Sequence, residues 1–127
     1  MKRLLGSLLL ALSLAACDQA TVPNASNNLR LIDNARQSGQ PTVVDFGSDS
    51  CASCRKMKVV MDDVARSAQG KAHVLVMDVF KDSSLLQPFR ISMIPTQIFF
   101  DAQGREAWRH MGTLTEDQVL ARIAPRN

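Results

Sequence analysis

The order of its apolar segments constrains the fold of this chain more than any other feature. Residues 42–46 and 73–79 are short and nearly continuous apolar runs, a pattern typical of buried strands. Between them, apolar side chains recur at helical spacing from Ala52 to about Ala68, and Gly70 ends that segment. A strand, a helix and a second strand in this order predict two parallel strands joined by a crossover helix.

The C-terminal half continues with a predicted hairpin and a helix. Residues 96–100 form a third predicted strand, a turn follows at 101–104, and residues 105–110 return as a fourth strand. The sequence 115–118 is a capping box that opens a last helix. A βαβ half followed by a ββα half predicts an α/β fold with a mixed central sheet and helices on both faces. A chain of 127 residues has room for one such domain.

Two shorter helices complete the predicted order. Asn27 or Asn28 is predicted to cap the first, and Ser83 to cap a brief one that runs through Leu86 to Phe89. The apolar side of the first helix is predicted to consist of Leu29, Leu31, Ile32 and Ala35.

The N-terminus has the pattern of a bacterial export signal. Lys2 and Arg3 precede the uncharged apolar run 4–16, which is too short to cross about 30 Å of hydrocarbon as a helix. The run ends in Leu-Ala-Ala followed by Cys17, which resembles a lipobox, so we expect residues 1–16 to be removed and Cys17 to carry lipid. An ordinary signal peptide followed by an incidental cysteine is the alternative. Residues 17–26 are then the lipidated N-terminus and tether, and 27–127 the folded domain.

The charge balance of the expected mature chain excludes one class of function. The net charge is +3, and removal of residues 1–16 would take two of the 15 basic residues and none of the 12 acidic ones, which leaves +1. A nearly neutral domain without a run of basic residues lacks the electrostatic footprint of a nucleic-acid-binding protein.

Two cysteines lie at the junction between the first strand and its helix, in the sequence Cys51-Ala52-Ser53-Cys54. A helix N-terminus carries partial positive charge, which stabilises a thiolate, the species that attacks disulfides. Cys51 is predicted to face solvent, and Cys54, one turn later, can attack a mixed disulfide. The basic residues Arg55, Lys56 and Lys58 either add positive potential or form an ordinary solvated helix face.

A metal site is the alternative interpretation of the two cysteines. Structural zinc takes four ligands, commonly from two such pairs. Only His73 and His110 are available besides the cysteines, and neither has a second histidine at ligand spacing. We therefore interpret both histidines as solvent-edge residues and expect no metal. Met57, Met61 and Met77 fall on apolar positions and are predicted to lie in the core.

These motifs together resemble thioredoxin. The strand 43–46, the Cys-x-x-Cys pair, Ile94-Pro95-Thr96 before a strand, Gly104 in the hairpin and Gly112 before the last helix match in order and spacing over residues 28–125. The sequence 49–57 is similar to the secreted, membrane-tethered members of that family, which include the C-terminal domain of DsbD.

The resemblance implies a thioredoxin fold and a set of roles in disulfide exchange. Cys51 would be the nucleophile and Cys54 the resolving cysteine. Pro95 would follow a cis bond and present the backbone of Ile94 to a substrate strand, with Met93 lining the groove. Asp45 would be the buried carboxylate that accepts the proton of Cys54, with a pKa raised by burial. From the residues alone, an exposed residue at the end of a strand is the alternative for Asp45.

The sequence also departs from the thioredoxin pattern. Ser50 replaces the usual tryptophan before the first cysteine, and Ala52-Ser53 replaces a Gly-Pro pair. The lysine that often accompanies the buried aspartate on the next strand is absent from 74–77. The redox potential of thioredoxin therefore does not transfer to this chain. Because no histidine lies between the cysteines, a strongly oxidising role is disfavoured.

These observations predict an extracytoplasmic thiol–disulfide oxidoreductase that reduces disulfides of envelope proteins. We expect a monomer without cofactor, held at the membrane by lipid on Cys17 and facing the periplasm; Asp18 favours the inner membrane. A reductant outside the cytoplasm needs its own electron supply, which implies a membrane electron donor of the DsbD or CcdA kind. The alternatives are a metal-binding or metal-delivery lipoprotein on the same fold, and an oxidase or isomerase of disulfides.

Overall fold

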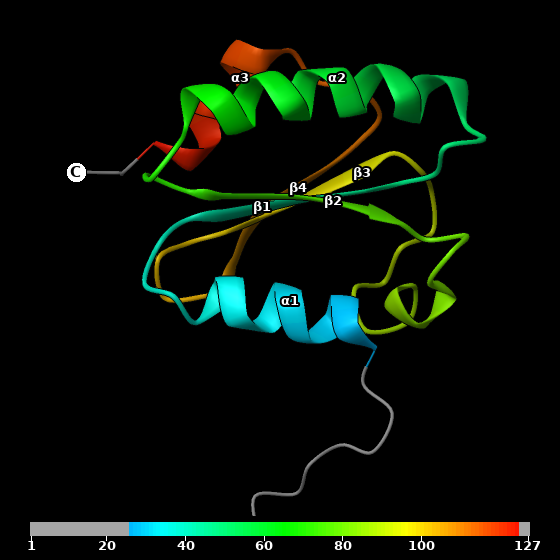
Figure 1. Ribbon diagram of the computed structural model, residues 1–127, viewed down its shortest axis with the longest axis horizontal. Helices are drawn as coiled ribbons and strands as arrows, with labels where there is room; N and C mark the ends of the chain where they lie inside the picture. The colour runs from blue at the N-terminus through cyan, green and yellow to red at the C-terminus, as the bar shows by residue number, and fades with distance from the viewer. Residues whose placement is uncertain (1–25, 125–127) are drawn as a thin grey trace, which may run out of the picture.

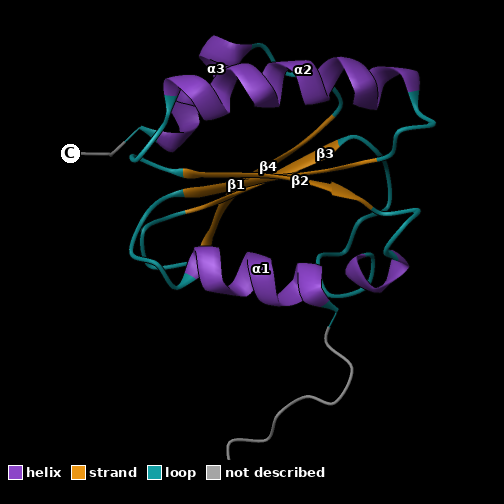
Figure 2. Cartoon of the chain, in the orientation of Figure 1, coloured by secondary structure: helices purple, strands orange, loops and turns teal. Residues whose placement is uncertain are grey.

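The structure, a computed structural model, describes residues 26–124. A central sheet lies between helix α1 on one side and helices α2 and α3 on the other (Figures 1 and 2). The elements follow in the order α1 (Asn27–Arg36), β1 (Thr42–Gly47), α2 (Ala52–Ser67), β2 (His73–Asp78), the 3-10 helix η1 (Ser83–Leu85), β3 (Thr96–Phe100), β4 (Glu106–Met111) and α3 (Glu116–Ile123). The predicted order of helices and strands is confirmed.

The sheet is mixed, with the strand order β2-β1-β3-β4. Strand β1 runs parallel to β2 and antiparallel to β3, and β4 runs antiparallel to β3. The two central strands are buried along their whole length, whereas β2 is only partly buried. The expectation that residues 73–79 form a fully buried strand is therefore wrong, because β2 forms an edge of the sheet and its side chains reach solvent.

The N-terminal helix begins one residue earlier than predicted. Ser26 is its N-cap, and its hydroxyl accepts a hydrogen bond from the backbone N–H of Leu29 at 3.1 Å. Ile32 and Ala35 are buried against the sheet as predicted, but Leu31 is 48% exposed. A helix that covers a sheet buries only one stripe, and Leu31 lies outside that stripe.

Two further elements bear on the predicted boundaries. The brief helix after β2 is a 3-10 turn that ends at Leu85 instead of reaching Phe89. The capping box is confirmed: Thr115 accepts a hydrogen bond from the N–H of Gln118, whose side chain accepts one from the N–H of Thr115.

Each face of the sheet packs against its own core. The core on the α1 face consists of Ile32, Val44, Phe46, Met77, Val79, Leu85, Phe89, Ile98 and Phe100. The core on the α2–α3 face consists of Val43, Met57, Met61, Val64, Ala68, Phe99, Leu114, Val119 and Ile123. The predicted core positions of Met57, Met61 and Met77 are thus confirmed.

Two cross-strand rows on the α2–α3 face matter for the site. Paired residues of adjacent strands point to the same face, so the register brings their side chains together. The apolar row consists of Val74, Val43, Phe99 and Trp108. The Asp45 row lies next to it on the same face, two residues away on each strand, and consists of Val76, Asp45, Gln97 and His110.

Candidate active site

Cys51 is the N-cap residue of α2. Its backbone is extended, with φ −97° and ψ 120°, and its Sγ accepts a hydrogen bond from the backbone N–H of Cys54 at 3.3 Å. The two cysteines form a disulfide with a Cα–Cα distance of 5.2 Å. In the reduced protein the same N–H and the helix dipole would stabilise a thiolate on Cys51. Cys54 is buried inside the first turn of the helix.

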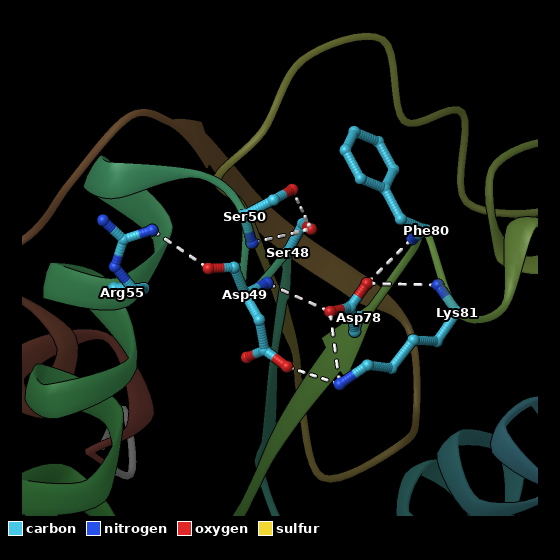
Figure 3. Close-up of polar contacts among 7 residues, drawn as sticks. All are labelled: Ser48, Asp49, Ser50, Arg55, Asp78, Phe80 and Lys81. Atoms are coloured by element: carbon cyan, nitrogen blue, oxygen red, sulfur yellow. Dashed lines mark hydrogen bonds and ion pairs between the residues drawn. The ribbon is translucent and has the colours of Figure 1, made fainter.

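The segment before Cys51 is fixed to the end of β2 (Figure 3). The carboxylate of Asp78 accepts hydrogen bonds from the backbone N–H groups of Asp49 at 3.0 Å, Phe80 at 2.9 Å and Lys81 at 3.1 Å. The N–H of Asp49, with those of Lys81 and Phe80, lowers the pKa of Asp78. Lys81 also forms an ion pair with the Asp49 carboxylate. These contacts anchor the loop that carries the first cysteine to its neighbouring strand.

Helix α2 and the loop itself supply further contacts. The guanidinium of Arg55 donates to the carbonyl oxygen of Asp49 at 3.0 Å, and the hydroxyls of Ser48 and Ser50 lie 2.9 Å apart (Figure 3). The backbone N–H of Cys51 donates to the carbonyl oxygen of Ser48 at 3.1 Å. Ser50, at the position where thioredoxins usually have tryptophan, is thus held within a polar turn.

Asp45 lies in the interior behind the cysteines and is 1% exposed. Its Oδ1 accepts a hydrogen bond from Nε2 of Gln97 at 2.8 Å, and its Oδ2 has no hydrogen-bond partner among the described residues. Burial raises its pKa to about 6, and the hydrogen bond from Gln97 opposes that rise. The alternative of an exposed strand-end residue is therefore wrong.

Gly47 separates Asp45 from Cys54 without filling the space between them. A β-carbon at Gly47 would lie 3.4 Å from Sγ of Cys54 and 3.7 Å from Oδ2 of Asp45. The sulfur and the unpartnered carboxylate oxygen are therefore close to one common point. They also line a pocket of about 280 Å³ whose wall includes the exposed side chains of Lys58 and Lys81. The pocket offers a route for water and protons to the buried acid.

A cis peptide bond joins Ile94 and Pro95. Thr96, the next residue, pairs with Phe46 of β1, which places Pro95 beside the end of β1 from which the cysteine loop departs. The carbonyl of Pro95 accepts from the N–H of Gly112 at 2.8 Å, and that of Met93 accepts from the hydroxyl of Thr96 at 2.6 Å. The side chain of Met93 is 57% exposed.

Sequence reasoning missed two residues of this site. Gln97 is an amide within the otherwise apolar run 96–100, which is a signal of a buried polar contact. Gly47 is the last residue of β1, and a β-carbon at this position would lie against Cys54. Strand β2 has no lysine beside Asp45, and two lysines from elsewhere line the pocket next to it, Lys58 of α2 and Lys81 after the end of β2.

The other predicted features fall outside this cluster or outside the described residues. His73 begins β2 and His110 stacks on Trp108 with ring centroids 5.6 Å apart. Within residues 26–124, no group of three or more His, Cys, Asp or Glu side chains could hold a metal ion. Over the same residues, no helix is long and apolar enough to cross a membrane. Cys17 and Asp18 lie outside the described residues.

A helix that starts at a Cys-x-x-Cys pair, a buried acid behind it and a cis-proline beside it define the class of dithiol proteins with a thioredoxin fold. A family profile described as "Thioredoxin-like domain" matches residues 30–125, so the chain belongs to the thioredoxin-like family. The Cys51–Cys54 pair on this domain is consistent with dithiol–disulfide exchange.

Individual proteins agree with this assignment. The chloroplast thioredoxin Y1 of Arabidopsis thaliana is 30% identical over 86 residues, which are 68% of this chain and 49% of that protein. The thiol:disulfide interchange protein DsbD of Ralstonia nicotianae is 35% identical over 79 residues, 58% of this chain and 13% of DsbD. This chain therefore spans about half of the first relative and a small part of the second. The crystal structure of thioredoxin NaTrxh from Nicotiana alata superposes with a TM-score of 0.66 at 25% identity, over 79% of this chain and 89% of that one.

Proposed function

We propose that this protein is an extracytoplasmic thiol–disulfide oxidoreductase that reduces disulfides of envelope proteins. The observation that carries the proposal is the position of Cys51, whose sulfur caps α2 and receives a backbone N–H while Cys54 lies buried behind it. A cysteine at this position is a good nucleophile, and a buried thiol three residues later is a good resolving group.

The reaction has two steps, and its electrons balance within the two cysteines and the client. First, the Cys51 thiolate attacks one sulfur of the client disulfide; a mixed disulfide forms and the other client sulfur leaves as a thiolate. Second, Cys54 loses its proton to Asp45 and attacks Sγ of Cys51. The mixed disulfide breaks, the second client sulfur leaves with the electron pair, and the protein is oxidised by two electrons while the client is reduced.

The edge next to Pro95 is the proposed binding site for the client. The carbonyl groups of Met93 and Pro95 are occupied by internal hydrogen bonds, so the intervening Ile94 is the residue whose backbone can pair with an extended client segment. The exposed thioether of Met93 adds an adaptable apolar contact beside that segment.

The proposed location and electron supply rest on the N-terminal sequence and on the similarity to one relative, DsbD. The uncharged run 4–16 before Cys17 supports export and lipid attachment, which would hold the domain near the membrane facing the periplasm. The similarity to part of DsbD, a thiol:disulfide interchange protein, supports a place in electron transfer outside the cytoplasm. The proposed electron donor is a membrane protein of the DsbD or CcdA kind.

The test uses two matched serine variants of the full chain. Cys54→Ser retains the nucleophile and should accumulate mixed disulfides with envelope proteins, which are identified after non-reducing electrophoresis. Cys51→Ser should trap nothing and should not reduce insulin. Trapping by Cys51→Ser instead, or alkylation of Cys54 before Cys51 in the reduced protein, would reverse the roles of the two cysteines.

Two further measurements test the direction of electron flow and the anchor. A reduction potential of the Cys51–Cys54 pair near that of thioredoxin, about −270 mV, is expected for a reductant, whereas a value near −120 mV would indicate an oxidase.

Mass spectrometry of the membrane-extracted protein should find a lipid on an N-terminal Cys17. An unmodified Cys17 thiol would remove the lipoprotein part of the proposal.

A further inference from the structure

Gln97 is a fully buried amide in the middle of the sheet, and it contacts the proposed proton acceptor directly. It pairs with Asp45 across strands β1 and β3, and its Nε2 donates to Oδ1 of Asp45 at 2.8 Å. The other carboxylate oxygen, Oδ2, lies 3.7 Å from the position that a β-carbon at Gly47 would take, and Sγ of Cys54 lies 3.4 Å from the same position. The hydrogen bond thus assigns different tasks to the two oxygens of one carboxylate.

We propose that Gln97 is a positioning residue for the dithiol chemistry, because its amide holds Oδ1 of Asp45 and keeps Oδ2 directed toward Cys54. This inference rests on the proposed function, in which Asp45 takes the proton of Cys54. In that step the Cys54 S–H bond breaks and an O–H bond forms at Oδ2, directly or through one water in the pocket. The Nε2–Oδ1 hydrogen bond remains intact in both protonation states.

A second consequence concerns the pH at which the acid works. An amide N–H binds a carboxylate more strongly than a neutral carboxylic acid, so Gln97 favours the ionised form. Burial favours the neutral form, and the pKa of about 6 reflects this opposition. Without Gln97, less Asp45 would be ionised near pH 6, and fewer molecules could accept the proton of Cys54.

Gln97 has opposite effects on stability through the two atoms of its amide. Its Oε1 is buried and has no hydrogen-bond partner among the described residues. An unpartnered buried polar atom is unfavourable, and an apolar side chain of similar length would avoid it. Replacement by methionine removes this unpartnered oxygen but also leaves Oδ1 of Asp45 without its hydrogen bond, so the variant should be less stable than the wild type where Asp45 is ionised, and closer to it where Asp45 is neutral.

A measured pH midpoint must be assigned to Asp45 and not to another ionisable group near it. The ionisable and charged side chains that line the pocket beside Asp45 are Cys54, Arg55 and Lys58 of α2, Asp49 of the preceding loop, Asp78 of β2 and Lys81 after it. The neighbour of Asp45 on β2 is the apolar Val76, and His110 lies beyond Gln97 on β4. His110 is the ionisable residue of the Asp45 row itself, so its replacement provides a control for the assignment of the pH dependence.

The test compares the full chain with its Gln97→Met variant by two measurements. The first follows the carboxyl carbon of Asp45 by NMR across pH 4 to 8 in the reduced protein, which reports its protonation whether or not the protein is active. The second is the pH dependence of insulin reduction. We expect both midpoints to rise by about one pH unit in the variant, with about five-fold slower reduction at pH 6. Gln97→Leu provides a second apolar variant if the first folds poorly.

Matched variants separate this effect from general perturbation. Thr42→Val removes another unpartnered buried oxygen from β1, three residues before Asp45 and on the opposite face of the sheet, and should leave the pH profile unchanged. His110→Gln should also leave the midpoint in place. In an Asp45→Asn background, Gln97→Met should have no further effect on the pH profile, because the group that it positions is gone.

The outcomes distinguish this inference from the proposed function. If the Asp45 midpoint does not move in Gln97→Met while Asp45→Asn still alters the profile, the inference about Gln97 is wrong and the function stands. If the wild-type chain reduces no disulfide at any pH, the function is wrong, and the NMR titration still decides whether Gln97 controls Asp45. A midpoint that moves in His110→Gln would assign the pH dependence to the histidine and overturn the inference.

Discussion

The two cross-strand rows beneath α2 each take one residue from every strand of the sheet, but one row is apolar at its centre and the other is polar. The apolar row buries Val43 and Phe99 at the centre of the sheet, and Phe99 packs on Trp108 with ring centroids 5.1 Å apart. The neighbouring row places Asp45 and Gln97 at the equivalent central positions, equally buried. One row contributes packing energy. The Asp45 row gives up some of that packing energy and places an acid near Cys54. Positions only two residues apart on the same strands therefore serve stability in one row and the proposed chemistry in the other.

The largest effect is expected from breaking the apolar row. Phe99→Ala removes a ring that is almost fully buried and should lower the free energy of unfolding by about 3–5 kcal/mol. Urea denaturation followed by Trp108 fluorescence measures this loss. Under conditions where the variant stays folded, the pH profile of disulfide reduction should match that of wild type, and a shifted profile would mean that the two rows are not separable.

Asp45→Asn should act in the opposite direction on stability. The folded pKa is raised from 3.8 to about 6, so the folded state binds the proton more tightly than the unfolded chain between these values. Stability of the wild type therefore falls as pH rises through this window, by about 3 kcal/mol in total, and stays lower above it. The variant should lose this pH dependence, so its stability relative to the wild type should be higher at pH 7 than at pH 4, measured by urea denaturation of both proteins at both values. It should also resolve mixed disulfides more slowly near neutral pH; equal insulin reduction from pH 6 to 8 would exclude Asp45 as proton acceptor.

Gly47→Ala tests the contact between the Asp45 row and the dithiol. The added β-carbon would lie 3.0 Å from Cβ of Cys54, closer than normal packing, so Cys54 must move away from β1. We expect a loss of about 1–2 kcal/mol and a slower release step. Single-turnover kinetics with a peptide disulfide would detect the slower step, and unchanged kinetics would show that Cys54 tolerates displacement.

The smallest effect is expected at the polar surface of the site. Lys81→Gln breaks an exposed ion pair with Asp49, and because solvent screens such pairs, stability should change little or not at all. The backbone hydrogen bonds to Asp78 remain and continue to hold the loop. Thermal denaturation at low and high salt measures the effect. A large loss would mean that the ion pair, and not the backbone network, positions the cysteine loop.

The sequence alone determined the order of elements, because each helix and strand has its own local signal. The periodicity from Ala52 to Ala68, the capping box at Thr115 and the placement of cysteines at a helix start are all local properties, and all are present in the structure. The burial of Asp45 was predicted only through the resemblance to thioredoxin, because the residues alone left an exposed strand end open, and the structure shows the residue buried.

Tertiary structure alone decided which residues meet. The edge position of β2 depends on sheet order, which residues 73–78 do not encode by themselves, and it left Val76 partly exposed. Gln97 lies 52 residues from Asp45, and only the antiparallel register of β1 and β3 brings the amide to the carboxylate. Hydrogen bonds between distant residues depend on strand pairing, and a one-residue slip would place Gln97 on the other face. For this reason the sequence could indicate Cys51, the proposed nucleophile, but not Gln97, the residue proposed to position Asp45.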